Sequence, residues 1–274
     1  MLATTKAVTP HFAVHEYHCD AGPHDEPFEE MHAEYSVSFV NRGSFGYRHR
    51  GQLHELIPGS LLVGSPGDEY MCTHEHHGAG DVCLSIKLSN AFVDEFARDR
   101  SLWRIGALPP IPEIMVLGEL AQAVADDRSD IAYDEIACAL AVKFAEVVRG
   151  TKTPVPKSTP RDRKRVVDIA HWIETNSHEE INLDAAARTA GLTSYHLLRL
   201  FARVLGVTPH QYLIRARLRH AARLLTDDGS TITQIAAAVG FADLSNFIRT
   251  FGRAAGMSPQ EFRKKAIGRR NETE

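Results

Sequence analysis

Hydrophobic and polar residues alternate in short runs through the first third of the chain. Tyr35, Val37 and Phe39 occupy every second position with serines between them, which is the period of a half-buried β-strand. Glycine-containing turns recur from Gly43 to Gly80 at spacings of roughly 8–12 residues. Short strands separated in this way predict a small β-sandwich or barrel.

After residue 110 the hydrophobic period becomes that of helices. Two apolar stripes recur every three or four residues, which predicts two amphipathic helices between residues 113 and 149. We expect these helices to pack on the β domain or against a second subunit. The stripes consist of Ile114, Leu117, Leu120, Ala121 and Val124, and of Ile136, Leu140, Phe144 and Val148.

A proline-rich segment at residues 151–160 separates this region from an all-helical remainder. Three prolines in ten residues disfavour both helix and strand and are typical of a semi-rigid linker. The sequence therefore predicts two folded domains, one on each side of the linker.

The helical remainder contains an internal repeat, with units at about residues 182–206 and 231–256. Equivalent glycine, arginine, phenylalanine and proline residues recur 49 or 50 positions apart. Each copy has the pattern of a short helix, a glycine turn and a second helix, which is the helix-turn-helix outline. The matched pairs are Gly191 and Gly240, Arg199 and Arg249, Phe201 and Phe251, Gly206 and Gly256, and Pro209 and Pro259.

The second helix of each copy is expected to bury a hydrophobic face and to expose arginines beside small polar residues. Arginine bonds guanine edges bidentately, and the other donors hold phosphates, so such a face suits a recognition helix. One alternative is that these are solvated faces of helical hairpins, which a single copy would favour and two matched copies disfavour. Another is a helical protein-interaction module that keeps the outline without binding DNA. The predicted DNA-contacting residues are Ser194, Tyr195, Arg199, Arg203, Ser245, Asn246, Arg249 and Arg253.

A helix predicted from Pro209 to about Leu225 joins the two copies. Thr208, Pro209 and Gln211 give it an N-cap, a first-turn proline and a capping-box partner. Its four arginines are interpreted either as phosphate contacts or as a solvated face. They are Arg215, Arg217, Arg219 and Arg223.

Charge is distributed unevenly over the 274 residues, whose formal net charge is −4. Residues 161–274 hold 18 basic and 12 acidic residues, a net of +6, and residues 1–160 carry −10. A basic half joined to an acidic half favours a polyanion as partner of the basic half. The absence of a recognisable signal peptide or membrane-length apolar run predicts a cytoplasmic protein without a membrane partner.

Residues 166–265 resemble the DNA-binding domain of the AraC/XylS family of transcription regulators. The resemblance rests on Gly240-Phe241, Asp243, Ser245, Phe247, Arg249 and Phe251, followed by Gly256 and Ser258-Pro259. It implies a non-enzymatic regulator, such as an activator, that binds double-stranded DNA. It further implies an effector, a homodimer, and RNA polymerase as a candidate partner.

Residues 30–90 resemble the cupin-like sensor barrel found before this domain in many family members. The segment from Pro58-Gly59 to Pro66-Gly67 carries that resemblance. The expected fold is α+β and two-domain. It combines an N-terminal cupin-like β-barrel plus two helices with a C-terminal all-α tandem helix-turn-helix domain. The expected boundaries are a sensor at 1–110, a helical connector at 111–150, the linker at 151–160 and the DNA-binding domain at 161–274.

A cupin metal centre is not expected, because its first motif is reduced to Glu30-x-His32-x-Glu34. A separate cluster of Cys72, His74, His76 and Cys83 forms a plausible tetrahedral set for zinc or another transition metal. We expect it on a hairpin turning at residues 78–80. The alternatives are a reversible Cys72–Cys83 disulfide sensor, a cupin-type metalloprotein, or an exposed hairpin with two buried thiols. Cys19 and Cys138 are interpreted as packing residues.

Overall fold

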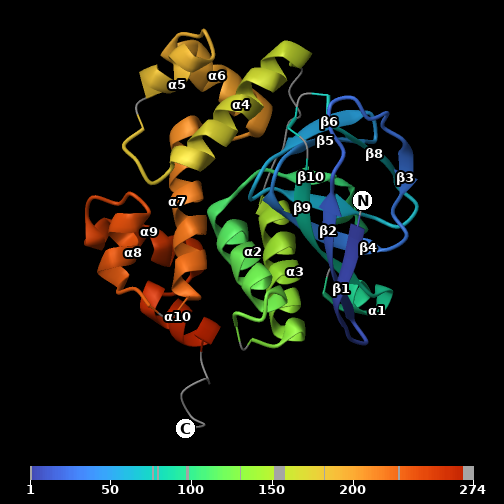
Figure 1. Ribbon diagram of the computed structural model, residues 1–274. Coiled ribbons are helices and arrows are strands. Elements are labelled where there is room, and N and C mark those ends of the chain that lie inside the picture. The colour runs from blue at the N-terminus through green and yellow to red at the C-terminus, as the bar shows by residue number, and fades with distance from the viewer. Residues whose placement is uncertain are drawn as a thin grey trace.

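The computed structural model describes residues 2–75, 77–78, 80–96, 99–129, 131–150, 158–181, 183–227 and 229–267. A strand-rich N-terminal part lies beside a helical C-terminal part, with two helices, α2 and α3, between them (Figure 1). No helix in these ranges is long and apolar enough to cross a membrane. The predicted linker falls largely on residues 151–157, which lie outside the described residues, so the domain boundaries stay a prediction.

The N-terminal part contains two antiparallel sheets. The six-stranded sheet has the order β1 (Leu2–Val8), β2 (Phe12–Cys19), β9 (Asp81–Leu88), β4 (Tyr35–Arg42), β7 (Leu61–Gly64) and β10 (Ala107–Leu108). The four-stranded sheet has the order β3 (Glu29–Met31), β8 (Glu69–Thr73), β5 (Phe45–His49) and β6 (Gln52–Leu56).

Helices make up the rest of the chain. The first are α1 (Asn90–Phe96), a 3-10 helix (Arg100–Arg104), α2 (Pro112–Ala125) and α3 (Tyr133–Gly150). The C-terminal part contains α4 (Pro160–Asn176), α5 (Leu183–Thr189), α6 (Ser194–Leu205), α7 (Pro209–Leu225), α8 (Ile232–Ala238), α9 (Leu244–Ala255) and α10 (Pro259–Ile267). The predicted fold class, a strand-rich domain with a helical tandem helix-turn-helix part, is confirmed.

Strand β4 has two different faces, as its alternating sequence predicts. Val37 and Phe39 are fully buried in the main hydrophobic core, whereas Ser36 and Ser38 line a cavity on the other side. Helix α2 approaches the apolar face closely, because a Cβ atom on Gly118 would lie 2.4 Å from the Phe39 ring. The predicted packing of the two helices on the β domain is therefore confirmed.

Helix α2 packs against both the N-terminal and the C-terminal part. It packs on α3 and β4 and, on its other side, on α7 and α9 (Figure 1). One hydrophobic core consequently runs from the six-stranded sheet through α2 and α3 to α7–α10. A second hydrophobic core lies between helices α4–α7 and includes Ile57 of the β domain. Both halves of the helical part are thus packed against the N-terminal part.

The internal repeat is a structural repeat. Helices α5 and α8 have seven residues each, and α6 and α9 have twelve each. Gly206 and Gly256 end α6 and α9 with the same left-handed φ of 70°, which a residue without a Cβ adopts at little cost. The capping box predicted between Thr208 and Gln211 is present at the start of α7.

Candidate nucleic-acid interface and sensor cavity

Helices α6 and α9 begin with side-chain caps that fix their N-terminal turns. The Thr193 hydroxyl accepts a hydrogen bond from the His196 backbone N–H at 3.2 Å. The Asp243 carboxylate accepts from the backbone N–H groups of Ser245 and Asn246, at 3.3 and 2.8 Å. Each cap satisfies N–H groups that the helix itself leaves unpaired.

The outer face of α9 has the composition expected of a recognition helix. Phe247 and Phe251 are fully buried, and Ser245, Asn246, Arg249 and Arg253 on the opposite face are exposed. The Arg249 guanidinium donates to the Asn246 amide oxygen at 3.1 Å, which restricts the arginine before any ligand binds.

Helix α6 repeats this arrangement. Leu197, Leu200 and Phe201 are buried, and Arg199 and Arg203 lie on the exposed face. Ser194 and Tyr195 belong to the helix, but their side chains lie outside the described residues. Exposed arginines therefore occupy equivalent positions on both helices.

The four arginines of α7 bond to other parts of the protein and do not form a purely solvated face. Arg215 donates to the Pro110 carbonyl oxygen. Arg217 donates to the carbonyl oxygens of Ser177 and Glu179, at 2.7 Å each. These partners lie far from α7 in the sequence.

Arg219 and Arg223 bind α7 to the N-terminal part through Glu119 of α2. Glu119 and Arg219 are each 1% exposed, with 3.4 Å between the carboxylate and the guanidinium. Arg223 donates twice to Glu119, at 2.6 and 2.9 Å, and also reaches the Asn41 side chain at 3.1 Å. Arg219 further bonds to the Asn41 carbonyl oxygen and to Glu174.

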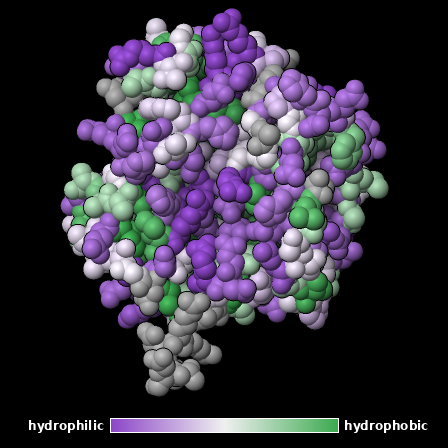
Figure 2. Space-filling view, viewed as in Figure 1, coloured by the Kyte–Doolittle hydropathy of each residue, from purple (hydrophilic) through white to green (hydrophobic). Residues whose placement is uncertain are grey.

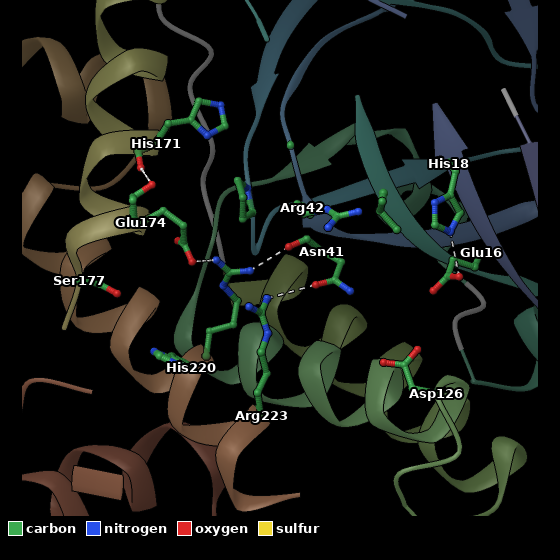
Figure 3. Close-up of a pocket in the computed structure, with 15 residues that line it drawn as sticks. Glu16, His18, Asn41, Arg42, Asp126, His171, Glu174, Ser177, His220 and Arg223 are labelled. Carbon is green, nitrogen blue, oxygen red and sulfur yellow. Dashed lines mark hydrogen bonds and ion pairs between the residues drawn. The ribbon is translucent and has the colours of Figure 1, made fainter. Parts of the chain in front are cut away.

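A polar cavity of about 700 Å³ lies at this junction. Charged side chains from the strands and from α4 and α7 surround it (Figure 3), and the corresponding seam is hydrophilic in Figure 2. Burial lowers the pKa of His171 and His220 on its helical side. Its lining includes Glu16, His18, Arg42, Asp126, His171, Glu174, His220 and Arg223.

A second polar chain joins the β domain to α4. Ser44 bonds both His77, at 2.8 Å, and His171 of α4, at 2.7 Å. His77 also lies 3.0 Å from the buried Glu55 carboxylate, which is 2.7 Å from the Arg163 guanidinium of α4. The segment that carries His77 therefore contacts the first helix of the DNA-binding part through two routes.

Another cavity, of about 400 Å³, lies between the two sheets and has residues of both in its lining. His32 borders it, hydrogen-bonds the Tyr47 hydroxyl at 2.9 Å and stacks on Tyr70 with ring centroids 4.1 Å apart. Burial lowers the pKa of His32 to about 4, so this histidine is neutral at pH 7. This cavity is the place where the N-terminal part can enclose a small molecule.

The predicted hairpin for the Cys/His cluster is wrong. Strand β8 ends at Thr73 and pairs with β3 and β5, whereas β9 pairs with β2 and β4, so the connection crosses from one sheet to the other. Cys72 and Cys83 nevertheless line the same cavity, on opposite sheets. His76 lies outside the described residues, and the four-residue metal site stays a prediction.

The described residues hold a different cluster of metal-ligand type around His74. Cys19, His74 and Asp81 have donor atoms within 4.8 Å of one another. Cys19 is directly opposite Asp81 across the β2–β9 pair. Burial raises the pKa of the Cys72 and Cys83 thiols, which disfavours the disulfide sensor because the thiolate is the reactive form.

Two helix-turn-helix units packed on a strand-rich domain with an internal cavity are typical of DNA-binding transcription regulators. A family model described as a helix-turn-helix domain matches residues 186–265. The HTH-type transcriptional activator RhaS of Pectobacterium carotovorum is 34% identical over 257 residues, covering 88% of this chain and 89% of that protein. The chain therefore belongs to the AraC/XylS family of transcription regulators.

Other similarities are shorter or weaker. The melibiose operon regulatory protein of Escherichia coli is 34% identical over 105 residues, which are 38% of this chain and 35% of that protein. The DNA-binding domain of AdpA, solved with a target DNA, is 26% identical and covers 39% of this chain and 96% of its own, with a TM-score of 0.37. ToxT of Vibrio cholerae matches 95% of this chain and 97% of its own at 16% identity and a TM-score of 0.37. Neither structural likeness bears on the family, because both TM-scores are low.

Proposed function

We propose that this protein is a sequence-specific regulator of transcription that binds double-stranded DNA through α6 and α9. The observation that carries the proposal is the equivalent pair of exposed arginine faces on two packed helices of equal length, each ended by a left-handed glycine. Recognition helices of this kind enter successive major grooves about one helical turn, roughly 34 Å, apart. The 17-residue α7 between them, roughly 25 Å long, is a stiff helix that holds the two units at a fixed separation.

In this proposal, different residues contact the base edges and the phosphates. Arg199 and Arg249 lie near the middle of the exposed faces and are assigned to base edges. Arg203 and Arg253 lie one turn further on and are assigned to phosphates, which supply affinity and salt dependence. The polar residues at the two helix starts contact bases or backbone; they are Ser194, Tyr195, Ser245 and Asn246.

The N-terminal part is the sensor in this proposal, and its cavity of about 400 Å³ receives the effector. An effector acts only if it binds DNA-competent and DNA-incompetent states with different affinity. The junction of α2 with α7 is where those states differ, because Glu119 ties the sensor to the helix between the recognition units. As with the RhaS relative, which is named an activator, we propose activation, with RNA polymerase as a partner and a cytoplasmic homodimer as the acting form.

The double variant Arg199→Ala/Arg249→Ala tests the DNA-binding face. Its affinity is measured by fluorescence anisotropy on duplexes that the wild-type protein selects from a random pool. Because each bidentate base contact supplies about 1–3 kcal/mol, we expect at least about a 30-fold loss with an unchanged circular dichroism spectrum. Arg100→Ala is the matched control, since that exposed arginine lies on the sensor.

Unchanged binding by the double variant would show that the outer faces of α6 and α9 do not read DNA. Failure of the wild-type protein to select any duplex would favour the alternative of a helical protein-interaction module.

A further inference from the structure

We propose that Cys19, His74 and Asp81 bind a thiophilic divalent metal ion of the zinc class, and that this ion controls the contact between sensor and DNA-binding part. The three residues come from β2, the crossover after β8, and β9, and all of them line the sensor cavity. Only His74 belongs to the four-residue site predicted from the sequence.

The distances between donor atoms match a tetrahedral site before any ion binds. Zn–S and Zn–N bonds of about 2.3 and 2.05 Å at a tetrahedral angle place sulfur and nitrogen about 3.6 Å apart, and nitrogen and oxygen about 3.4 Å apart. The Cys19 Sγ to His74 Nε2 distance is 3.9 Å, and His74 Nε2 to Asp81 Oδ2 is 3.4 Å. The two distances that involve His74 are therefore within a few tenths of an ångström of those values, and all three donor atoms lie within 4.8 Å of one another.

Charge supports the same assignment. Asp81 is 7% exposed, and among the described residues its carboxylate bonds to His74 and to the Cys83 thiol. Neither partner carries a fixed positive charge, and a buried carboxylate is costly without one. A divalent ion with one thiolate, one carboxylate and a neutral imidazole gives an electrically neutral cluster, with the Cys19 proton released to solvent.

The mixed donor set selects the kind of ion. Sulfur and imidazole donors favour zinc and neighbouring transition metals, whereas magnesium and calcium prefer oxygen ligands. Three protein ligands leave a fourth tetrahedral position for water or for a molecule in the cavity. Cys72 and Cys83 border the same cavity and provide further thiol donors close by.

The position of this cluster links it to the DNA-binding part. The segment from His74 to Asp81 carries His77, whose backbone N–H donates to the His74 carbonyl oxygen at 3.1 Å. His77 in turn contacts Ser44 and Glu55, which bond to His171 and Arg163 of α4. Fixing His74 and Asp81 on an ion therefore fixes the segment that holds α4. This coupling rests on the proposed function, whereas metal binding itself does not.

Cobalt titration of the full-length, tag-free protein tests the site. Co²⁺ substitutes for zinc and reports thiolate ligation through a charge-transfer absorption in the near ultraviolet. We expect one Co²⁺ per chain with that absorption, displaced by equimolar Zn²⁺. The Cys19→Ser variant should lack the absorption, and it should bind Zn²⁺ at least about tenfold more weakly than wild type. The isosteric Asp81→Asn, which keeps the buried shape, should lose affinity and keep the absorption.

Matched controls are Cys138→Ser on α3 and His24→Gln on an exposed loop, both expected to behave as wild type. The assignment is overturned if wild type gives no thiolate absorption, or if Cys19→Ser equals Cys138→Ser. Loss of the absorption only in a Cys72→Ser/Cys83→Ser variant would place the ion at the site predicted from the sequence instead.

The coupling is measured as DNA affinity with and without Zn²⁺ on the selected duplexes. We expect at least about a fivefold change for wild type, and none for Cys19→Ser or for Glu55→Gln, which keeps the ligands. Metal binding without any change in DNA affinity overturns the coupling alone. Metal binding without any DNA binding refutes the proposed function and leaves the metal site standing.

Discussion

Replacing Glu119 with glutamine removes the charge that holds two arginines of α7 against α2. The change keeps the side-chain size, so its effect is electrostatic. Breaking a buried ion pair by removing one partner costs about 3–5 kcal/mol, because the other charge stays buried. Arg219, 1% exposed, retains Glu174 and the Asn41 carbonyl oxygen, and the Arg223 side chain is 36% exposed and therefore screened.

Because these contacts remain, we expect the free energy of unfolding to fall by about 3 kcal/mol, the lower end of that range. For a chain of this size that corresponds to a fall in melting temperature of roughly 6–12 °C, measured by differential scanning calorimetry. Hydrogen exchange should rise in α2 and α7 and not in the outer strands. Glu146→Gln is the matched control, since Glu146 pairs with Lys143 at 2.6 Å on an exposed helix face and should change little. Equal melting temperatures for the two variants would refute the reasoning.

Three further outcomes are expected. Phe251→Ala should destabilise the second helix-turn-helix unit by about 3–5 kcal/mol in urea unfolding, because its ring is fully buried, whereas the half-exposed Ile248→Ala should cost less than about 1 kcal/mol; equal costs would contradict the assigned faces. The free energy of unfolding should fall as the pH drops from about 6.5 to about 4, because His32 is protonated in the unfolded chain over this range but stays neutral in the folded protein until its pKa of about 4. If His32→Gln showed the same dependence of unfolding free energy on pH as wild type, His32 would not contribute to it. Arg253→Ala should lower the slope of log affinity against log salt concentration by about one, and an unchanged slope would remove Arg253 from the phosphate contacts.

Local sequence patterns predicted the helical part well. Capping residues, glycines and prolines act within a few residues of themselves, so their spacing predicted both helix-turn-helix units and the start of α7. The alternation at residues 35–39 likewise predicted which face of β4 meets the helices.

Contacts between distant residues could not be read from the sequence. The α7 arginines have the composition of a solvated or DNA-binding face, and only the fold places Glu119, a hundred residues earlier, between two of them. The Cys/His cluster was assigned to a hairpin because its two strands are neighbours in sequence. Pairing of β2 with β9 instead brings Cys19 opposite Asp81, and no local signal reports that register.

Selection of binding sites from a random duplex pool tests the central claim most directly, carried out with wild type and with Arg199→Ala and Arg249→Ala singly. The account predicts an enriched site with two conserved segments about one helical turn apart, with each variant losing preference in a different segment. Enrichment of the same full site by both variants, or of no site by wild type, would contradict it.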